Sequence, residues 1–204
     1  EVLCLSASGG QQAVMFGLMG ANVSVFDLAP TQLERDEVAA KHYGYRLHTV
    51  VGDMRDLSEF RDNQFALVYQ AYSINFVDDT EPVFAEVARI LQPGGRYHIQ
   101  FANPFTQSVD DEAWDGETYL LQHPYVDGFE ITQYYPHWDV EDGNGGWMKL
   151  ESPKEYRHAL STVLNGLIGN GFLILHFEEE TSKVPDPEPG TWEHFKSVAP
   201  PYFT

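Results

Sequence analysis

The chain has 204 residues, of which 43% are hydrophobic, and carries a formal net charge of −19 from 31 acidic and 12 basic side chains. Nucleic acids are bound largely by cations that neutralise phosphates, so this acidity argues against a DNA or RNA partner. The apolar runs are strand-sized and interrupted by charge, and no basic stretch precedes one at the N-terminus, which argues against a membrane span or a signal peptide. The single cysteine, Cys4, cannot form an internal disulfide and fits a reducing compartment, so we expect a cytoplasmic protein.

The first half of the chain alternates short apolar runs with helix-like segments. We predict strands over residues 2–5, 23–26, 46–51, 65–70 and 96–101, and helices over residues 11–19, 30–43 and 83–91. Alternation at a spacing of about 20 to 30 residues predicts a parallel sheet with crossover helices. The predicted fold class is therefore α/β, with a doubly wound sheet in one domain that spans residues 1–204.

The regular alternation stops after the fifth predicted strand. Residues 104–153 are rich in Trp, Tyr, His and acidic side chains. We interpret them as an insertion arm or lid that follows a ligand-binding half, residues 1–103. Within the arm, residues 133–140 and 147–150 are expected to pair as a hairpin across the turn-forming Asp142-Gly143-Asn144-Gly145-Gly146.

The alternation resumes in the C-terminal part, residues 154–204. We predict a helix over residues 153–169, a sixth strand over residues 172–177, an acidic and proline-rich loop over residues 178–190, and an incomplete final edge strand that opens at residues 200–204. These elements extend the sheet of the predicted domain.

Two candidate ligand-binding signals follow the first and second strands. The loop Ser6-Ala7-Ser8-Gly9-Gly10 consists of small residues, which permit a tight turn and a close approach of the backbone to a ligand. Asp27 ends the second strand, 17 positions after Gly10, where a carboxylate is suited to accept hydrogen bonds from both hydroxyls of a ribose. Read alone, Asp27 also fits an ordinary acid before a helix that begins at Pro30.

Two further signals follow the third strand and precede the fifth. Gly52-Asp53-Met54 ends the third strand, where Asp53 is either a ligand-binding acid or a turn residue. Leu91-Gln92-Pro93-Gly94-Gly95 is a helix stop followed by a turn, because proline cannot continue a helix and glycine permits left-handed backbone. In open α/β sheets ligands bind at the carboxyl ends of the strands, so three of the four signals lie where a ligand is expected.

Together, these four ordered signals resemble the cofactor-binding framework of the class I S-adenosylmethionine-dependent methyltransferases, of the small-molecule type. The resemblance implies a Rossmann-like sheet, S-adenosylmethionine as cofactor, and in-line transfer of its methyl group to a small-molecule acceptor. It also implies that the residues that contact the cofactor are Ser6, Ser8, Gly10, Asp27, Leu28, Asp53, Met54 and Gln70.

The chain departs from the family pattern in the first loop and at its N-terminus. Cys4, Ser6 and Ser8 stand where the family has an acid and two glycines, so only Gly10 keeps the family residue type. Family members also have a helical segment before the first strand that closes over the cofactor, whereas here the strand follows Glu1 at once. We therefore expect an incomplete N-terminal lid.

Catalysis needs little from the protein, because a sulfonium is already a strong methyl donor and the acceptor must mainly be aligned with it. Tyr72 lies in the uncharged segment Gln70–Phe76 after the fourth strand, where the family resemblance implies contact with the donor methyl. Of the candidate general bases His123, His137 and His158, we favour His158. The sequence shows no spacing of His, Cys or acidic residues typical of metal ligands, so we expect no metal. We expect the aromatic residues of the arm to line the acceptor site or a homodimer contact.

Two alternatives remain at this stage. A non-catalytic protein that binds the cofactor or a partner on the same fold would explain the altered first loop. A nicotinamide-dependent oxidoreductase is remote, because its fingerprint needs glycines at positions 6, 8 and 11, and this chain has Ser6, Ser8 and Gln11.

Overall fold

A computed structural model of the chain describes residues 1–6, 11–110, 114–132, 136–141 and 145–204. Its centre is a six-stranded sheet in the order β10-β5-β4-β1-β2-β3. The strands are β1 (Val2–Leu5), β2 (Val23–Asp27), β3 (Leu47–Val51), β4 (Phe65–Ala71), β5 (Leu91–Ala102) and β10 (Tyr202–Phe203). All pair in parallel except β10, which is antiparallel to β5, so the predicted doubly wound α/β sheet is confirmed.

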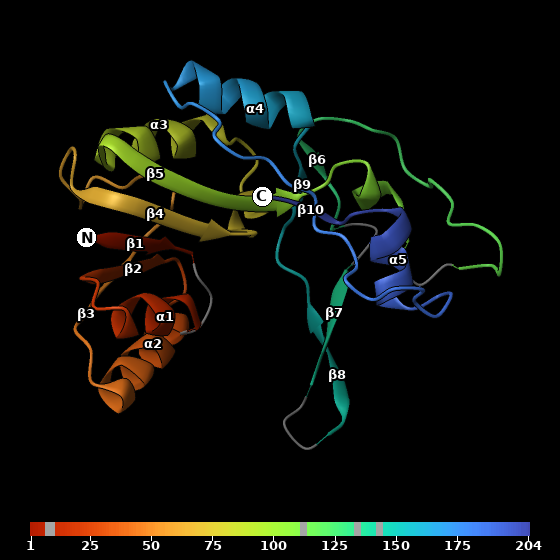
Figure 1. Ribbon diagram of the computed structural model, residues 1–204, viewed down its shortest axis with the longest axis horizontal. Coiled ribbons are helices and arrows are strands. Elements are labelled where there is room, and N and C mark those ends of the chain that lie inside the picture. The colour runs from red at the N-terminus through yellow and green to blue at the C-terminus, as the bar shows by residue number, and fades with distance from the viewer. Residues whose placement is uncertain (7–10, 111–113, 133–135, 142–144) are drawn as a thin grey trace.

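Helices cover both faces of this sheet (Figure 1). On one side lie α1 (Gln11–Leu18) and α2 (Pro30–Tyr43), and on the other lie α3 (Glu81–Ile90) and α4 (Leu160–Gly169). The strand order reverses between β1 and β4, because β2 and β3 extend the sheet to one side of β1 and β4 and β5 extend it to the other. A reversal of this kind leaves the crossover helices on opposite faces, and the carboxyl ends of β1 and β4 border the resulting crevice.

The main core lies between the sheet and the helices α3 and α4. Its fully buried side chains include Leu3, Phe65, Val68 and Phe84. Phe84 packs against α4 so closely that a Cβ atom at Gly166 would lie 2.8 Å from its ring. The two helices therefore meet through an aromatic side chain on α3 and a glycine on α4.

Smaller elements, most of them from the second half of the chain, lie beyond the carboxyl ends of the strands (Figure 1). These are the short helices η1 (Ser73–Phe76), η2 (Thr106–Ser108) and α5 (Trp192–Val198), the paired strands β6 (Phe129–Glu130) and β9 (Tyr156–Arg157), and the paired strands β7 (His137–Glu141) and β8 (Trp147–Glu151). The antiparallel β7–β8 hairpin confirms the predicted hairpin, although its turn at 142–144 and the predicted start at 133–135 lie outside the described residues. The hairpin projects away from the central sheet.

Several sequence-based boundaries were wrong, and one helix was missed. The helix predicted from residue 153 begins at Leu160, because Tyr156 and Arg157 pair with β6 instead. The helix predicted to run to residue 91 ends at Ile90, and Pro93-Gly94-Gly95 lies within the irregular start of β5, where Gly94 has a φ of +78°. The prediction also missed α5, which begins after Thr191, whose side chain accepts a hydrogen bond from the His194 backbone N–H.

The sixth strand predicted over residues 172–177 is not formed. Leu173 and Leu175 are 86% and 78% exposed, and the first sheet-like contacts come later, where Glu178 and Glu180 pair with β10. Between this segment and β5 lies an apolar cavity of about 1050 Å³. These residues have high β propensity. A strand also needs a hydrogen-bonded neighbour, however, and the sequence pattern does not specify one.

We predict that Phe84→Ala lowers the free energy of unfolding by about 3–5 kcal/mol, because it leaves a cavity between α3 and α4. Urea denaturation followed by circular dichroism measures the change. Val38→Ala, on the exposed side of α2, is the matched control and is expected to change stability by less than about 0.5 kcal/mol. Equal effects of the two substitutions would contradict this description of the core.

Candidate functional site

The carboxyl end of β2 presents a carboxylate at the crevice beside β1. Asp27 is only 8% exposed, and its Oδ1 accepts a hydrogen bond of 2.9 Å from the Ala29 backbone N–H. Within the described part of the chain its Oδ2 has no recorded hydrogen-bond partner. The next residue, Leu28, is 69% exposed. One carboxylate oxygen is thus fixed by the backbone, and the other has no hydrogen-bond partner among the described residues.

The loop after β1 starts next to this carboxylate. Ser6 has a φ of 50°, which is unusual for a residue with a side chain, and its backbone N–H donates a 2.7 Å hydrogen bond to the Phe26 carbonyl. Ser8 and Gly10 lie outside the described residues. Cys4, at the position of the family acid, is fully buried among apolar side chains, and this burial raises the pKa of its thiol to about 12. Cys4 is therefore a core residue.

The end of β3 lies against the end of β2. The Gly52 backbone N–H donates to the Asp27 carbonyl at 3.0 Å, and a Cβ atom at Gly52 would lie 2.3 Å from the Phe26 ring. This position therefore requires glycine. The Asp53 carboxylate binds Arg55, with Oδ2 and Nη2 2.6 Å apart, and this pairing lowers the pKa of Asp53. Both side chains are near the surface, where such a pair adds little stability.

Met54 and Gln70, both implied cofactor contacts, are buried together below the end of β4. The Gln70 amide nitrogen donates to Ser73 Oγ at 3.0 Å and contacts Met54 Sδ at 3.3 Å. The Tyr97 hydroxyl donates to the Gln70 amide oxygen. Because Gln70 has no exposed surface, its side chain supports the turn after β4 in this structure.

Tyr72 occupies that turn, directly after β4. It has a φ of 58°, in the left-handed region, and its backbone N–H donates to the Gln100 carbonyl at 2.9 Å. Its hydroxyl donates to the Glu155 carboxylate. Burial and the nearby Glu155 charge raise the pKa of Tyr72 well above its ordinary value, so the hydroxyl is protonated at neutral pH.

Glu155 reaches Tyr72 from the distant segment that precedes β9. Its Oε1 also accepts a hydrogen bond of 3.4 Å from the Gln107 amide, and its backbone N–H donates to Thr132 Oγ1 at 2.8 Å. Burial raises the pKa of Glu155, while the hydrogen bonds from Tyr72 and Gln107 oppose that shift. The structure thus brings a partly buried carboxyl group to the tyrosine at the end of β4.

Asn75 fixes this distant segment to the central sheet. It is almost fully buried, its amide nitrogen donates to the Tyr156 carbonyl at 3.0 Å, and its amide oxygen accepts from the Ala102 N–H at 3.0 Å. One side chain therefore links the turn after β4 to β5 and to β9. Because Tyr156 follows Glu155 directly, this link also positions the Glu155 carboxylate.

The predicted histidine bases lie elsewhere. His158 is 3% exposed, and its Nε2 is 2.9 Å from the Val77 carbonyl oxygen, which is the environment of a structural histidine. Its burial lowers its pKa. His137 is exposed at the start of β7. Among the described residues, the Tyr72 side chain contacts Glu155, Phe76 and Tyr202, and none of these is a histidine.

Among the residues that the structure describes, no group of three or more His, Cys, Asp or Glu side chains is arranged to hold a metal ion. No helix in the described ranges is long and apolar enough to cross a membrane.

We predict that Asn75→Ala lowers the free energy of unfolding by about 1–3 kcal/mol, because it leaves the Ala102 N–H and the Tyr156 carbonyl without this partner. Thermal and urea denaturation measure the loss. Asn165→Ala, at an exposed position of α4, is the control and is expected to stay within about 0.5 kcal/mol of the wild type. A wild-type stability for Asn75→Ala would show that the link is unimportant.

Comparison with known proteins identifies the family. A methyltransferase domain model matches residues 3–99. The chain is 31% identical over 182 residues to the uncharacterized methyltransferase YbaJ of Bacillus subtilis, covering 88% of this chain and 68% of that protein. It is 26% identical to the sterol 24-C-methyltransferase ERG6B of Gibberella zeae, covering 82% of this chain and half of that protein.

The fold comparison agrees with the sequence matches. The crystal structure of an S-adenosylmethionine-dependent methyltransferase from Mesorhizobium loti superimposes with a TM-score of 0.70 at 19% identity, covering 100% of this chain and 88% of that one. At this identity the likeness shows the fold alone. With the domain match and the YbaJ relationship, it confirms the family inferred from the strand-end signals: the chain belongs to the class I S-adenosylmethionine-dependent methyltransferases.

Proposed function

We propose that this methyltransferase transfers the methyl group of S-adenosylmethionine to a small-molecule acceptor at the carboxyl ends of β1, β2 and β4. The observation that carries the proposal is the Asp27 carboxylate at the end of β2, the neighbour of β1, which is buried, fixed through Oδ1 and, among the described residues, without a hydrogen-bond partner at Oδ2. A carboxylate in this position suits the two hydroxyls of a ribose. The family membership supplies the cofactor class.

The other residues around this crevice fit the same cofactor in different ways. The exposed Leu28 offers an apolar surface for the adenine ring, and Asp53 can accept from its amino group while still paired with Arg55. The loop of Ser6, Ser8 and Gly10 is proposed to hold the methionyl part. In contrast, the burial of Met54 and Gln70 favours an indirect role, in which they support the residues that contact the cofactor.

When bound, the cofactor supplies an electrophilic methyl group on a sulfonium sulfur. The protein's own contribution is to orient the acceptor and to remove water from around it. Tyr72 is proposed to face the methyl region, because it ends β4 and its ring is held by Phe76 and Tyr202, with ring centroids 5.8 and 5.2 Å away. The geometry of His158 fits support of the Val77 backbone, so it ranks below Tyr72 as a catalytic candidate.

We predict that Asp27→Ala weakens binding of S-adenosylmethionine and of S-adenosylhomocysteine by about 1–3 kcal/mol, because two ribose hydroxyls lose a charged acceptor. Isothermal titration calorimetry measures both affinities. Asp139→Ala, which removes an exposed carboxylate on the hairpin, is the matched control and should bind like the wild type. An unchanged affinity for Asp27→Ala would remove the central site assignment.

The wild-type protein tests the proposal as a whole. We expect it to bind both sulfur compounds and not NAD, and to release S-adenosylhomocysteine in the presence of one or more acceptors from a panel of phenols, alcohols, amines and thiols. Failure to bind either sulfur compound would contradict the proposed function. Binding without product in the whole panel would favour a non-catalytic cofactor-binding protein.

A further inference from the structure

The hydrogen bond between Tyr72 and Glu155 limits what Tyr72 can offer to an acceptor. The Tyr72 proton is directed to the Glu155 carboxylate, which is itself fixed by Gln107 and by its backbone contact with Thr132. A hydroxyl whose proton is committed in this way has only oxygen lone pairs left for another partner. Tyr72 is half-buried at the end of β4, and a ligand that reaches its hydroxyl there meets a hydrogen-bond acceptor.

An apolar surface continues from Tyr72 to the β7–β8 hairpin. The Phe76 ring lies 5.8 Å from the Tyr72 ring and 6.1 Å from the Trp138 ring, measured between centroids. Trp138 pairs with Leu150 across the hairpin, and Val140 pairs with Met148, so these four side chains share one face. We call these four residues the apolar hairpin face.

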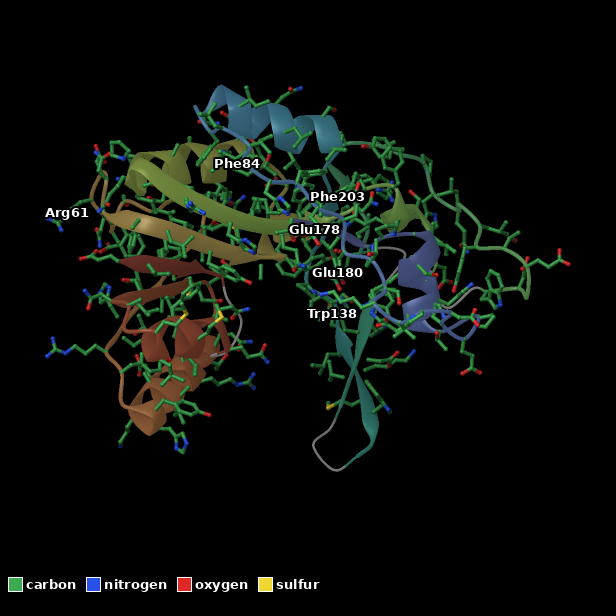
Figure 2. All side chains as sticks on the ribbon, in the orientation of Figure 1. Arg61, Phe84, Trp138, Glu178, Glu180 and Phe203 are labelled. Atoms are coloured by element: carbon green, nitrogen blue, oxygen red, sulfur yellow. The ribbon has the colours of Figure 1, made fainter. Side chains whose placement is uncertain are left out.

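Three of the four residues of the apolar hairpin face are exposed. Trp138, Met148 and Leu150 are 40%, 45% and 46% exposed. The hairpin projects from the body, and Trp138 lies at its end nearest the central sheet (Figure 2). The continuity of rings through Phe76 makes this face an extension of the surface beside Tyr72, which favours the methyl acceptor as its occupant.

We propose that the acceptor carries an O–H or N–H nucleophile on an extended apolar body. Its head donates a hydrogen bond to Tyr72 Oη, with Glu155 as the final proton acceptor, and its body lies on Phe76 and the apolar hairpin face. This inference rests on the proposed methyl transfer and names the class of substrate for it.

The reaction balances without a further reactant. The acceptor oxygen or nitrogen forms a bond to the methyl carbon while the carbon–sulfur bond breaks, and that electron pair stays on sulfur. The acceptor proton passes to Tyr72 Oη as the Tyr72 proton passes to the Glu155 carboxylate. For a neutral acceptor, the positive sulfonium and negative carboxylate become a neutral thioether and a neutral carboxylic acid, which later loses its proton to water.

The head of the acceptor is tested with 4-hexylphenol and 4-hexylanisole, which differ in the donor proton, on full-length protein saturated with S-adenosylhomocysteine. We expect the phenol to bind about tenfold more tightly by calorimetry, the ratio given by one ordinary hydrogen bond. Tyr72→Phe and Glu155→Gln should abolish this preference, whereas Glu151→Gln, on the exposed end of β8, should keep it. In Glu155→Gln the amide can donate to Tyr72, which frees the tyrosine proton to turn toward the ligand.

The body of the acceptor is tested with the same two probes. Trp138→Ala should weaken both on the order of fivefold by removing apolar contact area, while Trp147→Ala, on the opposite face of the hairpin, should leave both affinities unchanged. Sedimentation velocity of each variant shows whether the hairpin instead joins two copies of the chain. A changed association state with unchanged probe affinity in Trp138→Ala would overturn the hairpin part of the proposal.

The outcomes separate this inference from the proposed function. Equal affinities of the wild type for phenol and anisole, with tight S-adenosylhomocysteine binding, would overturn the acceptor class and leave the methyltransferase assignment intact. Failure of the wild type to bind S-adenosylhomocysteine would instead contradict the proposed function. Because the wild-type comparison needs no substitution, a variant that fails to fold does not remove the test.

Discussion

The turn after β4 is the constraint on which the rest of the site depends. Tyr72 adopts left-handed backbone there, which is costly for a residue with a side chain and persists only where the surroundings determine it. The Gln70 amide supports the turn from below, and Asn75 ties it to β5 and β9. If this turn relaxed, Tyr72 and Glu155 would lose their common position.

Two parts of the chain contribute different residues to the proposed site. The parallel strands bring Asp27 and the neighbouring strand ends to one edge, where the cofactor is proposed to bind. The later segments bring Glu155 and the hairpin to the same edge from outside the sheet. The methyltransferase domain model matches residues 3–99, which is the first of these parts. We expect the second part to determine which acceptor is bound.

The sequence was most informative where structure is local. Asp27 and the Gly52-Asp53 strand end were predictable because each follows a clear apolar run. Glu155 was not, because it lies 83 residues from Tyr72 and no motif marks a contact of that separation. His158 was predicted as a base from its sequence position, and in the structure its ring is buried with Nε2 2.9 Å from the Val77 carbonyl oxygen. The error over residues 172–177 has a related cause, since strand formation depends on a partner elsewhere in the chain.

A crystal structure of the full-length protein with S-adenosylhomocysteine tests the central claim most directly. The account predicts both ribose hydroxyls within hydrogen-bond distance of the Asp27 carboxylate, at about 2.6–3.0 Å, and the thioether sulfur directed toward Tyr72. A cofactor bound away from Asp27, or a sulfur directed away from the end of β4, would contradict it.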